Sequence, residues 1–406
     1  MYFSIKQVRN KYQLAGFSYF MDKYSVDAPY CRRIMCISRA QKNSMDKVRN
    51  IELVILNNRY RLKQEDVPNL VFVLKHETVD LIFLRNILKR INKKDLKNYI
   101  ENNMSGKYAK KIYFLYEYLL NKELEIKDEM KGAYIDILED DRYFTAKRIK
   151  FKKYKINDNF LGNRNFNPIV RKTQYIVKMI SKDFSEKINK ILSDTGEDIL
   201  SRAVDFLYKK ETKSSYKIEN ETAPKNKIEI FIELLKYAKD MEYLDKDNLT
   251  AIQNEIVLSK DKEDKDYYTK RQNYVGSYRN RKPIIHFIAA RPKDKHNLMK
   301  GLLGSNKRMK ESGTNPFIRA AVISYGFVFI HPFSDGNGRL HRFIIHSILK
   351  SSGIVPKEII IPISANMLNN PHRYNESLGN FSKPLMRKIS YKLDENEEIT
   401  VKGETK

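Results

Sequence analysis

The stretch HPFSDGNGRLHR, at residues 331–342, brings histidine, aspartate, asparagine, two glycines and two arginines together. The residues that follow, up to Gly353, show the apolar pattern of an amphipathic helix, so we expect a loop that leads into a helix N-terminus. Free backbone N–H groups and the positive end of the helix dipole attract phosphate at such a position. The stretch therefore predicts a phosphate-binding loop.

The glycines and arginines of this loop suit an anion. Gly336 and Gly338 let the backbone approach a phosphate closely, because neither has a side chain. Arg339 and Arg342 are three residues apart on the predicted helix, so both point from the same face and can bind phosphate oxygens.

Asp335 and His331 add the remaining chemistry. A lone carboxylate at Asp335, next to a polyphosphate, would be repelled unless it held a cation such as Mg²⁺. Neutral His331, at the entrance of the loop, can take a proton from a hydroxyl near pH 7. Taken singly, these residues are explained as well by turn glycines, helix-capping groups and a surface histidine, but the whole set favours attack of a hydroxyl on a metal-bound nucleotide phosphate.

The stretch resembles the signature of the Fic (filamentation induced by cyclic AMP) family, His-Pro-Phe-x-Asp/Glu-Gly-Asn-Gly-Arg-x-x-Arg, at every specified position. The resemblance implies a mainly α-helical bundle with a β-hairpin flap, and the transfer of AMP from ATP to a Ser, Thr or Tyr hydroxyl of a protein. It implies that His331 is the general base and that Asp335 binds Mg²⁺. The residues that it assigns to the phosphates of ATP are Gly336, Asn337, Gly338, Arg339 and, for the γ-phosphate, Arg342.

A second match lies upstream, where SYKIEN is similar to the inhibitory motif of the family, Ser/Thr-x-x-x-Glu-Gly/Asn. The spacing puts Ser215 and Glu219 on one helix face, and Asn220 follows. A carboxylate that reached Arg342 would take the place of the γ-phosphate and compete with it by charge. An ordinary solvated helix end would also explain this short pattern.

Residues 272–291 contain two short strand-like runs around a polar turn, which predicts a hairpin. The resemblance implies that this hairpin is a flap that positions the target protein by strand addition. Tyr274, Ile285 and Phe287 are the candidate residues for contacting the target. A hairpin that only packs against the core is the alternative. Tyr374 falls where relatives have an aromatic residue near the adenine, although a core tyrosine would look the same.

Around these elements the chain divides into four predicted parts. Residues 1–165 are expected to be a helical N-terminal region with a regulatory or target-binding role, and residues 166–225 to be linker helices that include the inhibitory helix. Residues 226–386 form the expected catalytic core. Residues 387–406 give a strand-like run and a charged tail.

Composition bounds the rest. The chain has 406 residues, with 77 Lys and Arg against 50 Asp and Glu, which gives a formal charge of +27. This charge suits the binding of nucleic acid. Because the lysines are spread along the chain, an AT-biased coding sequence would explain them as well. Two cysteines form neither a disulfide framework nor a zinc site. The sequence shows neither a signal peptide nor a membrane span, so we expect a cytoplasmic protein.

Three functions stay open beside inhibited protein adenylylation. The same fold can move another phosphate-containing group from a nucleotide, or it can remove AMP from a protein. A nucleic-acid-binding regulator that carries a Fic domain is the third. The sequence also leaves open which protein is the target, whether the chain modifies itself, and whether it forms a homodimer.

Overall fold

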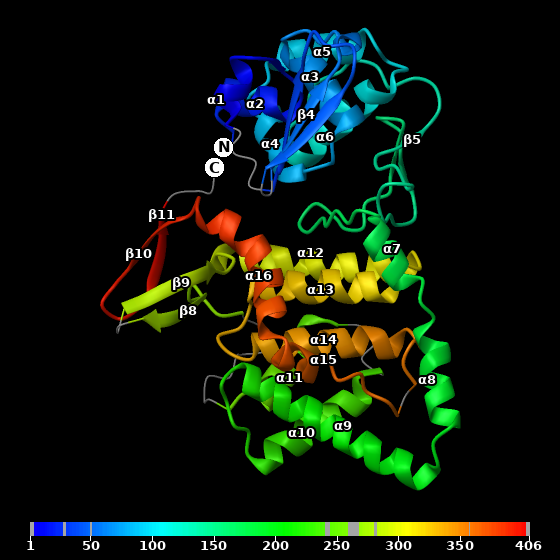
Figure 1. The fold of residues 1–406 in the computed structure, drawn as a ribbon, viewed down its shortest axis with the longest axis vertical. Coiled ribbons are helices and arrows are strands. Elements are labelled where there is room, and N and C mark those ends of the chain that lie inside the picture. The colour runs from blue at the N-terminus through cyan, green and yellow to red at the C-terminus, as the bar shows by residue number, and fades with distance from the viewer. Residues whose placement is uncertain are drawn as a thin grey trace. The chain divides into compact units, whose positions relative to one another are not determined.

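The computed structural model describes residues 4–26, 30–48, 51–239, 244–258, 268–279, 282–356 and 358–402. The chain forms two compact units, one of residues 1–139 and 148–159 and one of residues 140–147 and 160–405. Helical residues outnumber strand residues in both units, and the second unit is mostly helical, which confirms the predicted mainly α fold (Figure 1). No helix within these ranges is long and apolar enough to cross a membrane.

The N-terminal unit contains the helices expected from the apolar stripes, but it also contains a sheet. Its helices are α1 Ile5–Arg9, α2 Phe17–Tyr24, α3 Asp66–His76, α4 Leu81–Leu88, α5 Lys93–Glu101 and α6 Lys107–Leu120. The sheet has the order β1-β2-β4-β3, with β1 Gln13–Leu14, β2 Arg33–Ile37, β3 Ser44–Val48 and β4 Ile51–Leu56.

The N-terminal region, expected to be helical, therefore also contains a sheet that was not predicted. Strand β4 lies in the centre of the sheet and pairs in parallel with β2. A central strand carries apolar residues toward both faces, so the run IELVIL does not alternate and its period cannot be told from that of a buried helix. A smaller sheet, of order β5-β7-β6, follows with β5 Ile135–Asp136, β6 Ile149–Phe151 and β7 Ile156–Asp158.

The second unit is a helical bundle. Its helices are α7 Gln174–Ile180, α8 Phe184–Ser193, α9 Glu197–Ile218, α10 Lys225–Lys236, α11 Lys246–Ile256, α12 Pro292–Glu311, α13 Pro316–Ile330, α14 Asn337–Ser351, α15 Ile363–Asn369 and α16 Pro371–Met386. Helix α14 lies between α13 on one side and α9 to α11 on the other, as Figure 1 shows. Its residues are buried almost all round, and it forms the centre of the main hydrophobic core.

In the sequence, the Asn-Pro pair at 315–316 predicts the start of a helix and Gly353 the end of another, and α13 begins and α14 ends at these positions. Asn315 caps α13 by accepting a hydrogen bond from Phe317 N (3.0 Å), and Pro316 takes the first helical position. Gly336 precedes α14 with a φ of +82°, a conformation that glycine adopts without strain. Gly353 follows α14 with a φ of +74°.

Two β-hairpins complete this unit. Strands β8 Tyr274–Arg279 and β9 Lys282–Ile288 form the predicted flap, with an irregular register between Val275 and Gly276, while its turn at residues 280–281 lies outside the described residues. Strands β10 Ser390–Leu393 and β11 Ile399–Lys402 form a second hairpin. The C-terminal segment, expected to be one strand and a charged tail, therefore folds back on itself up to Lys402.

Candidate active site

The loop between α13 and α14 is held by side chains that come from distant elements. Asn273 Nδ2 donates hydrogen bonds to the carbonyl oxygens of His331 (3.3 Å) and Phe333 (2.5 Å). Gln253 Nε2 donates to the carbonyl oxygen of Asp335 (3.1 Å). Sequence reasoning missed both residues, because they lie 58 to 82 positions upstream of their partners and belong to no local motif.

The side chain of Asn337 holds the loop together. Its Nδ2 donates to Phe333 O (2.7 Å) and its Oδ1 accepts from Phe333 N (3.0 Å), and the residue is buried. The side chain therefore closes the loop against the first turn of α14. Only the backbone of Asn337 remains for the predicted binding of phosphate.

His331 is arranged as a neutral base. Its Nδ1 lies 3.1 Å from Val328 O, and because a carbonyl oxygen only accepts, this nitrogen carries the proton and Nε2 keeps its lone pair. Burial lowers the pKa of His331, the hydrogen bond to Val328 opposes this shift, and the positive charge of Lys295 adds to it. The imidazole is therefore neutral at pH 7.

Lys295 was not predicted. Its Nζ donates to the carbonyl oxygens of Thr269 (3.4 Å) and Arg271 (3.2 Å), and the residue is buried. Thr269 N in turn donates to Pro332 O (3.0 Å). This buried cation thus joins residues 269–271 to the loop and keeps a positive charge near His331.

Arg342 contacts the predicted inhibitory residues. The residue is 1% exposed; its Nε donates to Ser215 Oγ (2.8 Å), and its Nη2 donates to Ser215 O (2.7 Å) and Glu219 Oε1 (2.9 Å). Among the described residues, the buried Nη1 has no partner. Asn220 does not take part through its side chain; it turns the chain out of α9 with a φ of +60°.

Glu219 also lies against the start of α14. A Cβ placed on Gly338 would lie 2.0 Å from Glu219 Oε1, so only glycine permits this approach. The first turn of α14 is where free backbone N–H groups and the helix dipole favour a negative charge. The carboxylate of Glu219 therefore occupies the position at which the sequence predicts a phosphate.

Arg339 is held by two carboxylates. The residue is 1% exposed; its Nη1 donates to Glu221 Oε2 (2.6 Å) and Ile256 O (3.2 Å), its Nη2 donates to Asp335 Oδ1 (2.8 Å), and the guanidinium stacks on Tyr216 at 5.1 Å. Glu221 was not predicted. Burial raises its pKa, the charge of Arg339 lowers it, and the neighbouring acids raise it again.

Asp335 is the residue that fits a metal ion. Its Oδ1 accepts from Arg339 and from Gly336 N (2.5 Å), and its side chain is 32% exposed. Within the described ranges, no three His, Cys, Asp or Glu residues gather in a way that would hold a metal. One carboxylate nevertheless fits Mg²⁺, which is usually held by one or two carboxylates together with substrate phosphates.

His331 borders two cavities. The first, of about 580 Å³, lies between the flap and α16 and is mainly apolar, with Ile285, Phe287 and Phe329 in its wall. The second, of about 500 Å³, is polar and has Tyr274 in its wall. The flap residues expected to position a target therefore divide between the two cavities, because successive side chains of a strand point to opposite faces.

Tyr374 lies close to Arg342. Among the described residues it does not line the apolar cavity, to which the next residue, Asn375, contributes. Burial raises the pKa of Tyr374 to about 12, and Arg342 is the next largest influence on it. Tyr374 therefore lies beside the arginine rather than at the apolar cavity.

Comparisons with known proteins point to one family. Residues 243–349 match the Fic/DOC family. Protein adenylyltransferase fic-1 of Caenorhabditis briggsae and its namesake of Caenorhabditis elegans are each 33% identical over 76 residues, 19% of this chain and 14% of theirs. A Fido domain-containing protein of Dictyostelium discoideum is 38% identical over 61 residues, 15% of this chain and 41% of that protein.

Similar solved structures are a Fic family protein from Desulfovibrio desulfuricans G20 and Fic-1 (residues 134–508) of C. elegans. The first has a TM-score of 0.41 and 19% identity over 51% of this chain and 66% of that one. The second has a TM-score of 0.32 and 15% identity over 79% of this chain and 93% of that one. The family match spans the signature loop and its flanking helices, and the chain therefore carries a Fic/DOC domain.

Proposed function

We propose that this protein is a Mg²⁺-dependent protein adenylyltransferase that is inhibited by its own Glu219. The observation that carries the proposal is the position of Glu219, bound to Arg342 at 2.9 Å and packed on Gly338. The sequence of the phosphate-binding loop and the names of the relatives, protein adenylyltransferases, support the transfer of AMP. The match covers only 14% of those relatives, so the activity itself is the proposal.

The reaction would use few groups. The hydroxyl oxygen of a target side chain attacks the α-phosphorus of ATP, a new O–P bond forms, the bond to the β-phosphate oxygen breaks, and pyrophosphate leaves. His331 Nε2 accepts the hydroxyl proton, since its Nδ1 proton is held by Val328. Asp335 would hold Mg²⁺, which neutralises phosphate charge when bound.

The two cavities beside His331 suit two substrates. The apolar cavity can take a nucleobase, because its walls offer large apolar faces from the flap and α16. The polar cavity would then take the target segment that brings the hydroxyl. His331 lines both cavities, so its imidazole can reach the hydroxyl where the hydroxyl meets the α-phosphate.

Inhibition follows from charge. The γ-phosphate and the carboxylate of Glu219 are both anions that seek Arg342, and they repel each other at close range. Ser215 fixes the guanidinium through two hydrogen bonds, so Arg342 cannot rotate to bind the Glu219 carboxylate and the γ-phosphate at the same time. ATP would therefore bind productively only when Glu219 leaves.

Transfer of label to protein tests the proposal. ATP labelled at the α- or the γ-phosphate, with Mg²⁺, is compared in wild type, Glu219→Ala and His331→Ala. We expect α-label to be transferred about tenfold or more faster in Glu219→Ala, since 1.4 kcal/mol of lost competition is a factor of ten. Transfer should disappear in His331→Ala.

Glu197→Ala is the matched control, because Glu197 lies exposed at the other end of the same helix. Movement of the γ-label would instead identify transfer of phosphate. Loss of AMP from a modified protein, abolished in Glu219→Ala, would identify removal of AMP.

A further inference from the structure

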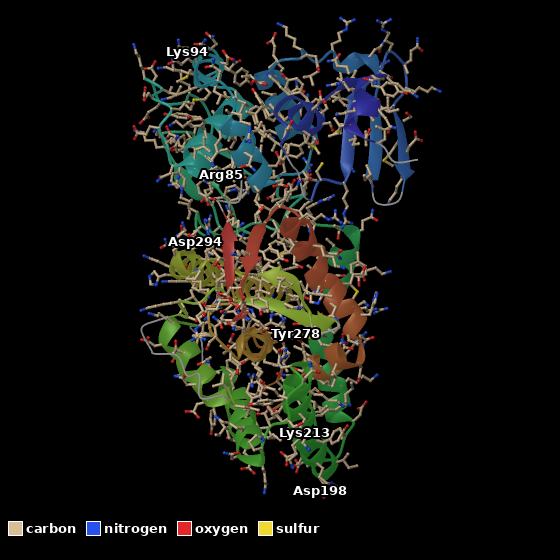
Figure 2. All side chains as sticks on the ribbon, turned by 90° about the vertical axis from the view of Figure 1, so that its left-hand side faces the viewer. Arg85, Lys94, Asp198, Lys213, Tyr278 and Asp294 are labelled. Atoms are coloured by element: carbon tan, nitrogen blue, oxygen red, sulfur yellow. The ribbon has the colours of Figure 1, made fainter. Side chains whose placement is uncertain are left out.

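A groove lies on the outer side of α9, beyond the inhibitory contact. It has a volume of about 1110 Å³ and runs between α9 and α10, with Leu368 of α15 at one side. Figure 2 labels Lys213 of α9, one of the residues that line the groove. The groove touches neither the loop at 331–336 nor the flap, so the proposed reaction does not use it.

One wall of the groove is basic. Lys209, Lys213 and Lys217 line it and are exposed. They stand four residues apart, so their side chains leave one helix face about 6 Å apart along the axis. Among the described residues, none of their amino groups has a hydrogen-bond or ion-pair partner.

The opposite wall is apolar. Ile228 and Ile232, one turn apart on α10, line it together with Ala223 and Leu368, and all are only partly buried. Two acids also reach the groove, but each already faces a cation: Glu221 binds Arg339, and Glu229 lies 3.9 Å from Lys225. The groove therefore presents a row of lysines whose charge is not neutralised by acids, beside a row of apolar side chains.

We propose that this groove binds an amphipathic helix that carries acidic residues, supplied by a partner protein. The lysines of α9 and the isoleucines of α10 each recur once per helical turn. A third helix in the groove can therefore place a row of Asp or Glu against the lysines and a row of apolar residues against the isoleucines. A small polyanion is the weaker fit, because the three lysines are exposed, lie on separate turns and are not joined by a buried arginine.

The same partner would touch the turn that carries Glu219. Asn220 and Glu221 line the groove directly after Glu219, and Lys217 lies two residues before Glu219. Binding in the groove would thereby bear on the contact between Glu219 and Arg342; this consequence, unlike the binding itself, rests on the proposed function. The surface is thus placed to connect a partner protein with the active site.

Fluorescence anisotropy with the full chain, without nucleotide, tests the binding. The probe is a labelled helical peptide of about 15 residues, long enough for four turns, with Glu and Leu on adjacent stripes. We expect the peptide to bind, and the variant Lys209→Glu, Lys213→Glu, Lys217→Glu to weaken binding by about tenfold or more. A peptide with Lys in place of Glu should bind this variant better than the wild type.

The matched control changes three exposed lysines near α8, in the variant Lys182→Glu, Lys187→Glu, Lys190→Glu, which has the same net charge. It should bind the acidic peptide like the wild type. Equal weakening in both variants would show attraction to overall charge and overturn the proposal. Binding of tripolyphosphate at this groove without binding of the peptide would overturn it as well, as would absence of binding by the peptide at low salt.

Discussion

Glu211 on α9 and His346 on α14 meet in the core at 2.9 Å, and this contact fixes how the two helices lie along each other. One turn further, Ser215 meets Arg342, and another turn further Glu219 meets Gly338. The residue number rises by four on α9 while it falls by four on α14, so the helices are antiparallel and in register. The approach of Glu219 to Gly338 is thus the last of three contacts on one helix interface.

Glu211 should be the residue that holds this interface together. Its carboxylate also accepts hydrogen bonds from the backbone N–H groups of Ser364 (2.8 Å) and Ala365 (3.3 Å), at the start of α15. We expect Glu211→Ala to lower the free energy of unfolding by about 3–5 kcal/mol, because it leaves buried donors unpaired. Urea unfolding measures this. A loss below that of an exposed control, Glu197→Ala, would contradict the prediction.

The same carboxylate predicts how stability depends on pH. Burial alone would raise the pKa of Glu211, but the contacts with His346 and Ser364 outweigh it and hold the pKa below its ordinary value of 4.5. A carboxylate with a lowered pKa stabilises the folded state above the ordinary value and loses this contribution as the pH falls through the lowered one. Stability should therefore decline below pH 4.5, and Glu211→Gln should decline less steeply over that range. Equal slopes would contradict this.

Most of the candidate site could be recognised in the sequence because its residues are close in the chain. The loop from His331 to Arg342 carries its spacing with it, and the pairing of Glu219 with Arg342 needed only a second short motif. Glu221, Lys295 and Asn273 could not be predicted in this way. They reach the loop only through the packing of the bundle, and a single Glu, Lys or Asn on a helix or in a loop looks like a solvated residue.

The fold shows the same division. Helix ends with local signals, such as Asn315 and Gly353, lie where the sequence predicts them. The sheet of the N-terminal unit and the pairing of β10 with β11 depend on partners elsewhere in the chain, and a short apolar run does not reveal them.

Gly338 should be needed for nucleotide binding as well as for the inhibitory contact. Gly338→Ala would place a methyl group against Glu219 Oε1, and the same group would narrow the approach of a phosphate to the helix N-terminus. In a Glu219→Ala background, where no carboxylate is left to collide, we expect Gly338→Ala still to weaken ATP binding by about tenfold or more. Isothermal titration calorimetry measures this; unchanged affinity in that background would show that the glycine serves only the inhibitory contact.

Asp335 should set the requirement for Mg²⁺. Asp335→Asn keeps the size of the side chain and an oxygen acceptor but removes the charge that attracts the ion. We expect the variant, in the Glu219→Ala background, to need about tenfold more Mg²⁺ for half-maximal transfer of AMP. A titration of Mg²⁺ at saturating ATP measures it, with Asp198→Asn at the exposed start of α9 as a control. An unchanged requirement would remove Asp335 from the metal site.

The base His331 predicts the pH dependence of the reaction. Burial and the charge of Lys295 lower its pKa from the ordinary value of 6.5, and only the neutral imidazole can accept the hydroxyl proton. In Glu219→Ala, the midpoint of the decline of kcat/KM with falling pH should therefore lie below pH 6.5. Lys295→Met removes a positive charge that opposes protonation of His331, so the decline should begin at a higher pH in that variant. If the profiles of the two proteins coincide, or if the midpoint of the decline lies above pH 6.5 with Lys295 in place, His331 is not the group whose proton uptake stops the reaction.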